Sequence, residues 1–105
     1  MRDSLGISYD YSGNMTYNGN WINDKRNGYG ISYCKTGVKR YEGEWKKDLR
    51  DGNGRSYHTN GAVKYDGLWV GNAKHGEGKI FNVEGNLVFH GVWNNNIRDR
   101  KSIEK

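Results

Sequence analysis

Cys, His and Asn side chains, a set that can support nucleophilic thiol catalysis, occur at one recurring position of this sequence. Cys34, His58 and Asn82 follow one another at intervals of 24 residues, and Asp10 precedes them by one further interval. A cysteine becomes a strong nucleophile when a histidine lies within about 3 Å and takes its proton. Catalysis would therefore require the fold to bring Cys34 and His58 that close together.

The equal intervals argue against such a site, because they are the period of a repeat. If each repeat contributes two strands, equivalent positions lie about 9.5 Å apart, at about 4.8 Å per strand. That distance is too long for proton transfer, and we interpret the column as residues near hairpin turns. His58, His75 and His90 occupy different positions of the repeat, so no metal site is expected. We predict no catalytic residue, no metal and no cofactor, and hence a protein that is not an enzyme.

The same period organises the aromatic residues and the glycines. The segment Tyr-Asn-Gly-Asn-Trp at 17–21 returns as Tyr-Glu-Gly-Glu-Trp at 41–45, Tyr-Asp-Gly-Leu-Trp at 65–69 and Phe-His-Gly-Val-Trp at 89–93. Of the 16 glycines, all except Gly71 fall into four columns of the repeat. A pattern this regular indicates a repeat architecture.

Each repeat has the pattern of two short β-strands. Residues 41–45 alternate between apolar and polar side chains, the period of a strand with one apolar face. A loop is expected at 47–51, a second strand at 52–58 and a tight turn at 59–61, where Asn-Gly favours positive φ. Glycine inside a strand indicates that another group lies close to the backbone. We expect that group to be the Tyr and Trp rings of adjacent strands.

The sequence thus predicts an all-β fold: an elongated, twisted antiparallel meander of β-hairpins in a single layer, with about seven or eight strands and no helix before the tail. The 105 residues form one repeat domain, divided into a half unit at 5–16, units at 17–40, 41–64 and 65–88, a partial unit at 89–98 and a C-terminal cap or tail at 99–105. A further aromatic column, which strict alternation places on the face opposite the tryptophans, comprises Tyr9, Tyr33, Tyr57 and Phe81.

The pattern Tyr-x-Gly-x-Trp, then Gly-x-Gly and a further Gly before the next Tyr, resembles the MORN repeat (membrane occupation and recognition nexus) over residues 5–93. Repeats of that family usually have 23 residues, and here one extra residue lies between the turn glycine and the next Tyr, as in 37–41. The resemblance implies an elongated sheet that acts as an interaction platform. Family members serve mainly in protein–protein contacts, scaffolding and self-association, and phospholipid binding has been proposed for some.

Composition argues against several other classes of protein. No apolar run approaches the roughly 20 residues that span a bilayer, and residues 1–6 lack the apolar stretch of a signal peptide. The single cysteine, Cys34, cannot form an intramolecular disulfide, so we expect a reducing, cytoplasmic location. Hydrophobic residues make up 33% of the chain and aromatic residues 13%, so Tyr and Trp supply the apolar mass of the fold.

The aromatic columns are the candidate binding surface. In a small sheet with few aliphatic side chains, each ring can simply belong to the core. A single layer cannot bury both faces, however, and exposed Tyr and Trp often anchor protein interfaces. We predict an adaptor, scaffold or small inhibitor that binds a protein partner through Tyr17, Trp21, Tyr41, Trp45, Tyr65, Trp69, Phe89 and Trp93.

Basic residues concentrate in the middle of a chain whose net charge is +5. Acidic neighbours dilute them, so they form either a solvated mixed surface or, as the alternative function, a surface for anionic phospholipid. Salt would separate lipid from protein binding, because it screens exposed charges. We do not expect nucleic acid, since about 9.6 Å between tryptophans exceeds one nucleotide step. The open edges of the first and last strands predict a homodimer. The candidate anion contacts are Lys39, Arg40, Lys46, Lys47, Arg50, Arg55 and Lys64.

Overall fold

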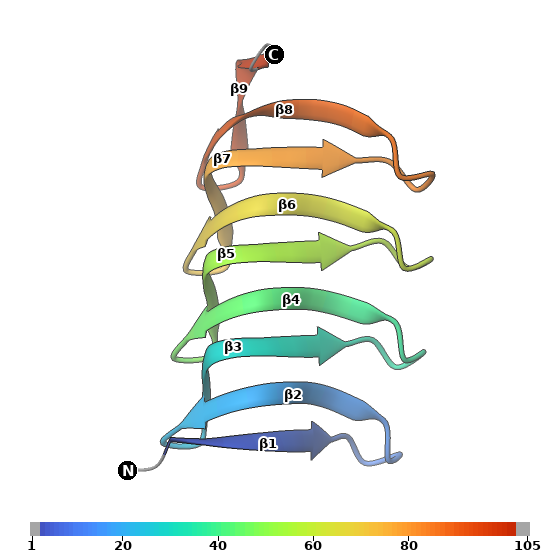
Figure 1. The fold of residues 1–105 in the computed structure, drawn as a ribbon, viewed down its shortest axis with the longest axis vertical. Helices are drawn as coiled ribbons and strands as arrows, with labels where there is room; N and C mark the ends of the chain where they lie inside the picture. Colours follow the sequence, from blue (N-terminus) through green and yellow to red (C-terminus); the bar gives the residue numbers. More distant parts are fainter. Residues whose placement is uncertain (1–2, 103–105) are drawn as a thin grey trace.

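The computed structural model describes residues 3–102, which form one open antiparallel sheet (Figure 1). Every strand pairs with its neighbours in sequence, so the order across the sheet is β1 to β9. The predicted all-β meander of hairpins is confirmed. The strands are β1 (Asp3–Tyr9), β2 (Met15–Ile22), β3 (Lys25–Tyr33), β4 (Lys39–Lys46), β5 (Leu49–Tyr57), β6 (Val63–Val70), β7 (Ala73–Phe81), β8 (Leu87–Asn94) and β9 (Ile97–Ser102).

The described chain has nine strands, more than the seven or eight expected. The additional strand is β9, which pairs with β8 and extends into the segment 99–105 that was expected to be a cap or tail. Residues 103–105 of that segment lie outside the described residues. Loss of the Gly-x-Gly pattern therefore does not end the sheet, because strand pairing uses backbone groups that every non-proline residue carries.

The sheet is elongated, with extents of 43 × 29 × 19 Å. β1 and β9 lie at opposite ends of the stack and form its two edges within the described chain (Figure 1). The homodimer through these edges stays a prediction. Among residues 3–102 there is no helix long and apolar enough to cross a membrane.

Two-residue turns follow β2, β4, β6 and β8. Both residues of each turn have positive φ, as at Lys47 (49°) and Asp48 (70°). This backbone geometry matches the twist of a β-hairpin. It allows β5 to begin at Leu49, so the loop expected at 47–51 is shorter than predicted.

The turns after β1, β3, β5 and β7 are longer. In the turn after β5, the N–H of His58 donates to the carbonyl of Ala62, and that of Gly61 donates to the carbonyl of His58. Gly61 has a φ of 93°, whereas Asn60 is not among the residues with positive φ. The turn lies where Asn-Gly predicted it, but only the glycine uses the left-handed conformation.

Tyrosine and tryptophan rings form the core of the sheet. Seven of the eight predicted rings are buried, and Trp21 packs against them. The Tyr41 ring lies edge-to-face with Trp45 in its own repeat at 5.1 Å and with Trp69 in the next at 5.4 Å. The indole N–H of Trp45 donates to the carbonyl of Gly30 on the preceding strand (3.1 Å). This ladder of rings joins each repeat to the next.

Gly54 shows why glycine recurs inside the strands. A Cβ atom at this position would collide with the hydroxyl and ring of Tyr41. A Cβ atom at Gly30 or at Gly78 would collide in the same way with the tyrosine of the preceding strand. The prediction that rings lie across the glycines is confirmed.

The two faces of the sheet carry different side chains. We call the face with the Tyr–Trp ladder the ring face and the opposite one the outer face. Glu42 follows Tyr41 in β4 and therefore points to the outer face. Tyr57 donates its hydroxyl to Glu42 at 2.9 Å. Tyr57 thus lies opposite the tryptophans, as alternation predicted for its column.

Candidate binding groove

A β-bulge at the start of β4 turns one extra residue toward the ring face. Lys39 and Tyr41 pair with consecutive residues of β3, which leaves Arg40 without a partner of its own. The two residues of a bulge share one position of the opposite strand. Arg40 consequently lines the hollow above Tyr41. Lys64 occupies the same bulge position at the start of β6.

A second column of cations lies directly over the rings. These residues recur every 24 positions, near the start of β3, β5, β7 and β9. A cation within about 6 Å of an aromatic centroid is attracted by the ring quadrupole. The shortest distances to a ring centroid are 4.3 Å for Arg26 over Trp45, 4.5 Å for Arg50 over Trp69, 5.2 Å for Lys74 over Trp93 and 4.2 Å for Arg98 over Phe89.

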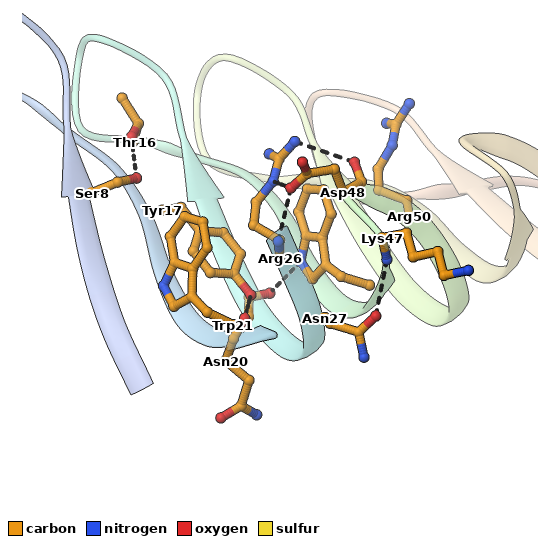
Figure 2. Close-up of polar contacts among 12 residues, drawn as sticks. Ser8, Thr16, Tyr17, Asn20, Trp21, Arg26, Asn27, Lys47, Asp48 and Arg50 are labelled. Carbon is orange, nitrogen blue, oxygen red and sulfur yellow. Dashed lines mark hydrogen bonds and ion pairs between the residues drawn. The ribbon is translucent and has the colours of Figure 1, made fainter. Parts of the chain in front are cut away.

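The first of these cations is neutralised by its own chain. The Arg26 side chain forms an ion pair with Asp48 through Nε and Oδ1 at 3.0 Å, and the same oxygen accepts the Arg26 backbone N–H (Figure 2). Burial tends to raise the pKa of Asp48, but these bonds from Arg26 outweigh it and hold the pKa below its ordinary value. Asp48 therefore stays ionised and cancels the charge of Arg26.

The second cation has the same geometry without the opposing charge. Arg50 donates from Nε to the Asn72 side-chain oxygen at 3.0 Å, and its backbone N–H donates to the same atom at 2.8 Å. The next repeat has Lys74 at the position of Arg50, and the Lys74 backbone N–H donates to the side-chain oxygen of Asn96. Among residues 4–98, no carboxylate lies within ion-pair distance of Arg50 or Lys74.

These unpaired cations influence one another. Burial lowers the pKa of Arg50, and the nearby guanidinium groups of Arg40 and Arg26 lower it further. Burial also lowers the pKa of Lys74, with Lys64 and Arg50 acting in the same direction. The shifts mark a cluster of like charges held in partly desolvated positions, which an anion would stabilise.

The cations line two adjoining hollows of the ring face, of about 490 and 320 Å³, which share Arg40, Arg50 and Asn72. The larger hollow also contains Asp10 and Asp48, whereas no Asp or Glu lines the smaller one. We call the smaller hollow the central groove. Its charged and aromatic lining includes Arg40, Arg50, Lys64, Trp69 and Lys74, together with Asn72 from the turn between β6 and β7.

On the outer face several charges are paired with one another. Glu42 accepts hydrogen bonds from Lys39 at 2.9 Å and from the hydroxyl groups of Tyr29 and Tyr57. The hydrogen bond from the Tyr29 hydroxyl, and as the second largest cause the one from Lys39, lower the pKa of Glu42 to about 2. Arg55 forms an ion pair with Asp66 on the next strand at 3.3 Å. These four charged residues of the outer face therefore satisfy one another, unlike the cations of the central groove.

The predicted site residues separate into three groups. The aromatic residues, apart from Trp21, have at most 9% of their surface exposed, so a partner on this face would meet mainly the groups above them. Of the candidate anion contacts, Arg40, Arg50 and Lys64 line the central groove. The remaining four lie elsewhere: Lys39 and Arg55 on the outer face, and Lys46 and Lys47, both exposed, at the end of β4 and in the following turn.

Sequence reasoning missed Lys74, together with Arg26 and Arg98. The signal was available, because these residues and Arg50 form a column with the same 24-residue period as the rings. It was overlooked because the basic residues were grouped by closeness in sequence. Position in the repeat, and not neighbourhood along the chain, determines which cations share a face.

The Asp10, Cys34, His58, Asn82 column lies where the long turns begin. Asp10 and Asn82 accept backbone N–H bonds from the residues that follow them, and His58 Nε2 contacts the carbonyl of Phe81 at 2.8 Å. Cys34 is half-buried, and no hydrogen bond connects it to His58 within the described residues. Across the described part of the chain, no group of three or more His, Cys, Asp or Glu could hold a metal ion.

The fold and the groove define a class, that of β-sheet repeat proteins whose hairpin units stack into one open layer. Three consecutive segments, residues 17–39, 41–63 and 65–86, match the family model of the MORN repeat. The chain belongs to the MORN-repeat family, a non-enzymatic repeat module that generally mediates interactions with proteins or membranes. Among curated proteins, no match to the chain is found. Residues 40 and 64, the two basic bulge residues, fall between the matched segments.

Proposed function

We propose that this protein is a non-catalytic interaction module that binds a protein partner along the central groove. The observation that carries the proposal is the groove itself: four cations from two successive hairpins, β4–β5 and β6–β7, face one hollow that no Asp or Glu lines. The buried rings give the groove its shape, and the cations above them contact the partner. The protein would act as an adaptor, scaffold or small inhibitor.

The energetic cost of the groove supports this role. Like charges that are held close together and partly desolvated repel one another, which lowers the stability of the free protein. Asp48 relieves that repulsion at Arg26, whereas Asn72 occupies the equivalent position beside Arg50. An arrangement that leaves the free protein less stable is typical of a site that functions when a partner is bound.

The alternative, binding to an anionic phospholipid surface, has weaker support. The basic residues considered for it lie on both faces of the sheet, and Lys39 and Arg55 already pair with carboxylates. A flat bilayer contacts one face at a time. The unpaired cations lie in a hollow, which an inserted chain segment reaches more readily than a membrane surface does.

Site-directed crosslinking tests the proposal. Ser56, which lines the central groove, is replaced with p-benzoylphenylalanine, and Leu68, which is exposed on the outer face beside Trp69, is replaced in a control variant. Both variants are illuminated in a lysate of the source cell, and crosslinked products are identified by mass spectrometry. We expect one protein on the groove variant and none on the control.

Equal labelling of the two variants, or crosslinks to lipid alone, would contradict the proposal. The crosslinked peptide also identifies which segment of the partner enters the groove. A cytoplasmic location and self-association through the edges of β1 and β9 belong to the same proposal. A monomeric mass in light scattering at high concentration would contradict self-association.

A further inference from the structure

The cations of the central groove form two equivalent pairs. Arg40 and Arg50 lie on the hairpin formed by β4 and β5, and Lys64 and Lys74 occupy the corresponding positions of the hairpin formed by β6 and β7, 24 residues further on. Within each pair, one residue is the bulge residue and the other lies over a tryptophan ring or beside it. Each pair can therefore receive one anionic group from two sides.

The stacking of repeats sets the spacing of the two pairs. Equivalent positions are two strands apart, about 9.6 Å at about 4.8 Å per strand. A polyproline II chain advances about 3.1 Å per residue with three residues per turn, so every third side chain returns to the same side after about 9.3 Å. Side chains in a β-conformation return to one side after about 6.6 Å, which does not match the spacing.

We propose that the central groove binds an acidic segment of a protein chain in an extended, polyproline II-like conformation, with two carboxylate side chains three residues apart. The Arg40–Arg50 pair receives one carboxylate and the Lys64–Lys74 pair receives the other. This inference rests on the proposed function and specifies the partner of the same groove. The bulge residues make this binding site particular to this chain, because positions 40 and 64 lie between the segments that match the family model.

The distribution of the other charges favours a segment of limited length. The bulge position carries Thr16 in the preceding repeat and Val88 in the following one, so neither extends the double row of cations. In the larger hollow, Asp10 and Asp48 would repel an acidic chain. A long polyanion such as nucleic acid would meet these carboxylates, whereas a peptide with two acidic residues would not.

Binding of designed peptides tests the inference directly. A fluorescein-labelled peptide of sequence Pro-Pro-Glu-Pro-Pro-Glu-Pro-Pro is compared with Pro-Pro-Glu-Pro-Glu-Pro-Pro-Pro, which has the same composition with the acidic residues two apart. A third peptide carries Gln at both acidic positions of the first. Fluorescence polarisation with the full chain should show at least fivefold tighter binding of the first peptide than of either control. Equal binding of all three would overturn the inference.

Protein variants locate the site. Arg50→Gln and Lys74→Gln should each weaken binding of the first peptide about tenfold, the effect of losing one charge-assisted hydrogen bond. Lys46→Gln at the outer-face end of β4 and Lys79→Gln, which lies opposite Asp66 in the strand register on the outer face, serve as matched controls and should leave binding unchanged. An equal loss in all four variants would show nonspecific charge attraction and overturn the inference.

Asn72→Asp tests the inference without removing any cation. The new carboxylate would occupy the position that Asp48 has in the preceding repeat and would pair with Arg50. We expect it to weaken peptide binding at least fivefold while the protein stays folded. The reciprocal Asp48→Asn frees Arg26 and should tighten binding about twofold or more, because it removes a carboxylate from the adjoining hollow. No change in either variant would overturn the inference.

Two competitors distinguish other ligands. The competitors are vesicles of phosphatidylserine and phosphatidylcholine, and a dT12 oligonucleotide. If either displaces the labelled peptide at a lower concentration than unlabelled peptide does, the groove is a site for lipid or nucleic acid and the inference is overturned. The inference and the proposed function can fail separately. If Ser56 crosslinks to a partner segment without acidic residues, the proposed function stands and the inference fails.

Discussion

The first and second repeats place an arginine over a tryptophan in nearly the same way, yet only one of the two charges is available to a ligand. Arg26 lies 4.3 Å from the centroid of Trp45, and Arg50 lies 4.5 Å from that of Trp69. Arg26 is neutralised by Asp48, whereas Arg50 bonds to an uncharged amide. The scaffold of rings and the charge it presents are therefore set by different residues.

The shared scaffold provides the largest predicted effect. Gly54→Ala would place a Cβ atom against the ring of Tyr41, so we expect the free energy of unfolding to fall by roughly 3 kcal/mol. Gly61→Asn is the comparison variant: open space surrounds Gly61, so only backbone strain at its φ of 93° should lower the stability, and by less than Gly54→Ala does. Urea unfolding followed by tryptophan fluorescence measures both. A loss below about 1 kcal/mol in Gly54→Ala would show that the ring can move aside.

A second prediction compares a central repeat with the last one. The indole N–H of Trp69 donates to the carbonyl of Gly54 at 3.2 Å, whereas that of Trp93 is buried without a partner in the described chain. Trp69→Phe loses a hydrogen bond, while Trp93→Phe removes an unsatisfied donor. We expect Trp69→Phe to destabilise the protein by about 1 kcal/mol more than Trp93→Phe does in urea unfolding. Equal losses would mean that the indole bond contributes little.

The repeat explains how much of this architecture could be predicted from sequence. The Tyr-x-Gly-x-Trp columns predicted the strands, the ladder and the packing of rings over glycine, because each depends on residue types at a fixed spacing. The strand β9 was missed because its pairing depends on the backbone and not on glycine. Arg40 and Lys64 were recognised as basic, but their face was not predicted. Simple alternation places their side chains on the outer face, away from Tyr41 and Tyr65, and the bulges turn them to the ring face.

The paired charges of the outer face predict a pH dependence that the groove should not share. Tyr29, and after it Lys39, lower the pKa of Glu42 in the folded protein to about 2, against an ordinary value of 4.5. Between these values the unfolded chain binds more protons, so stability falls as the pH decreases from about 4.5 to 2. Glu42→Gln should reduce the slope of the free energy of unfolding against pH in this window, by up to the equivalent of about one bound proton. An unchanged slope in urea unfolding at several pH values would show that other carboxylates dominate.

The smallest predicted effect on stability exchanges the residues that distinguish the first two repeats. Asn72→Asp keeps both acceptor bonds to Arg50 and adds a charge, so it should stabilise the protein by up to about 1 kcal/mol. Asp48→Asn should destabilise it by a similar amount, because Arg26 and Asp48 are both partly exposed and solvent screens their attraction. Urea unfolding at about 0.05 and 0.5 M salt checks both values, since high salt should shrink each difference.

The double variant Asp48→Asn, Asn72→Asp sharpens this comparison, because it moves the neutralising carboxylate by one repeat without changing net charge. If the two positions are equivalent, its stability should lie within about 0.5 kcal/mol of the unaltered protein. Its peptide binding should nevertheless be weak, because Arg50 is then paired. A large change in stability would show that the repeats differ in more than this one residue. Retained binding would show that the charge of Arg50 is not what the ligand recognises.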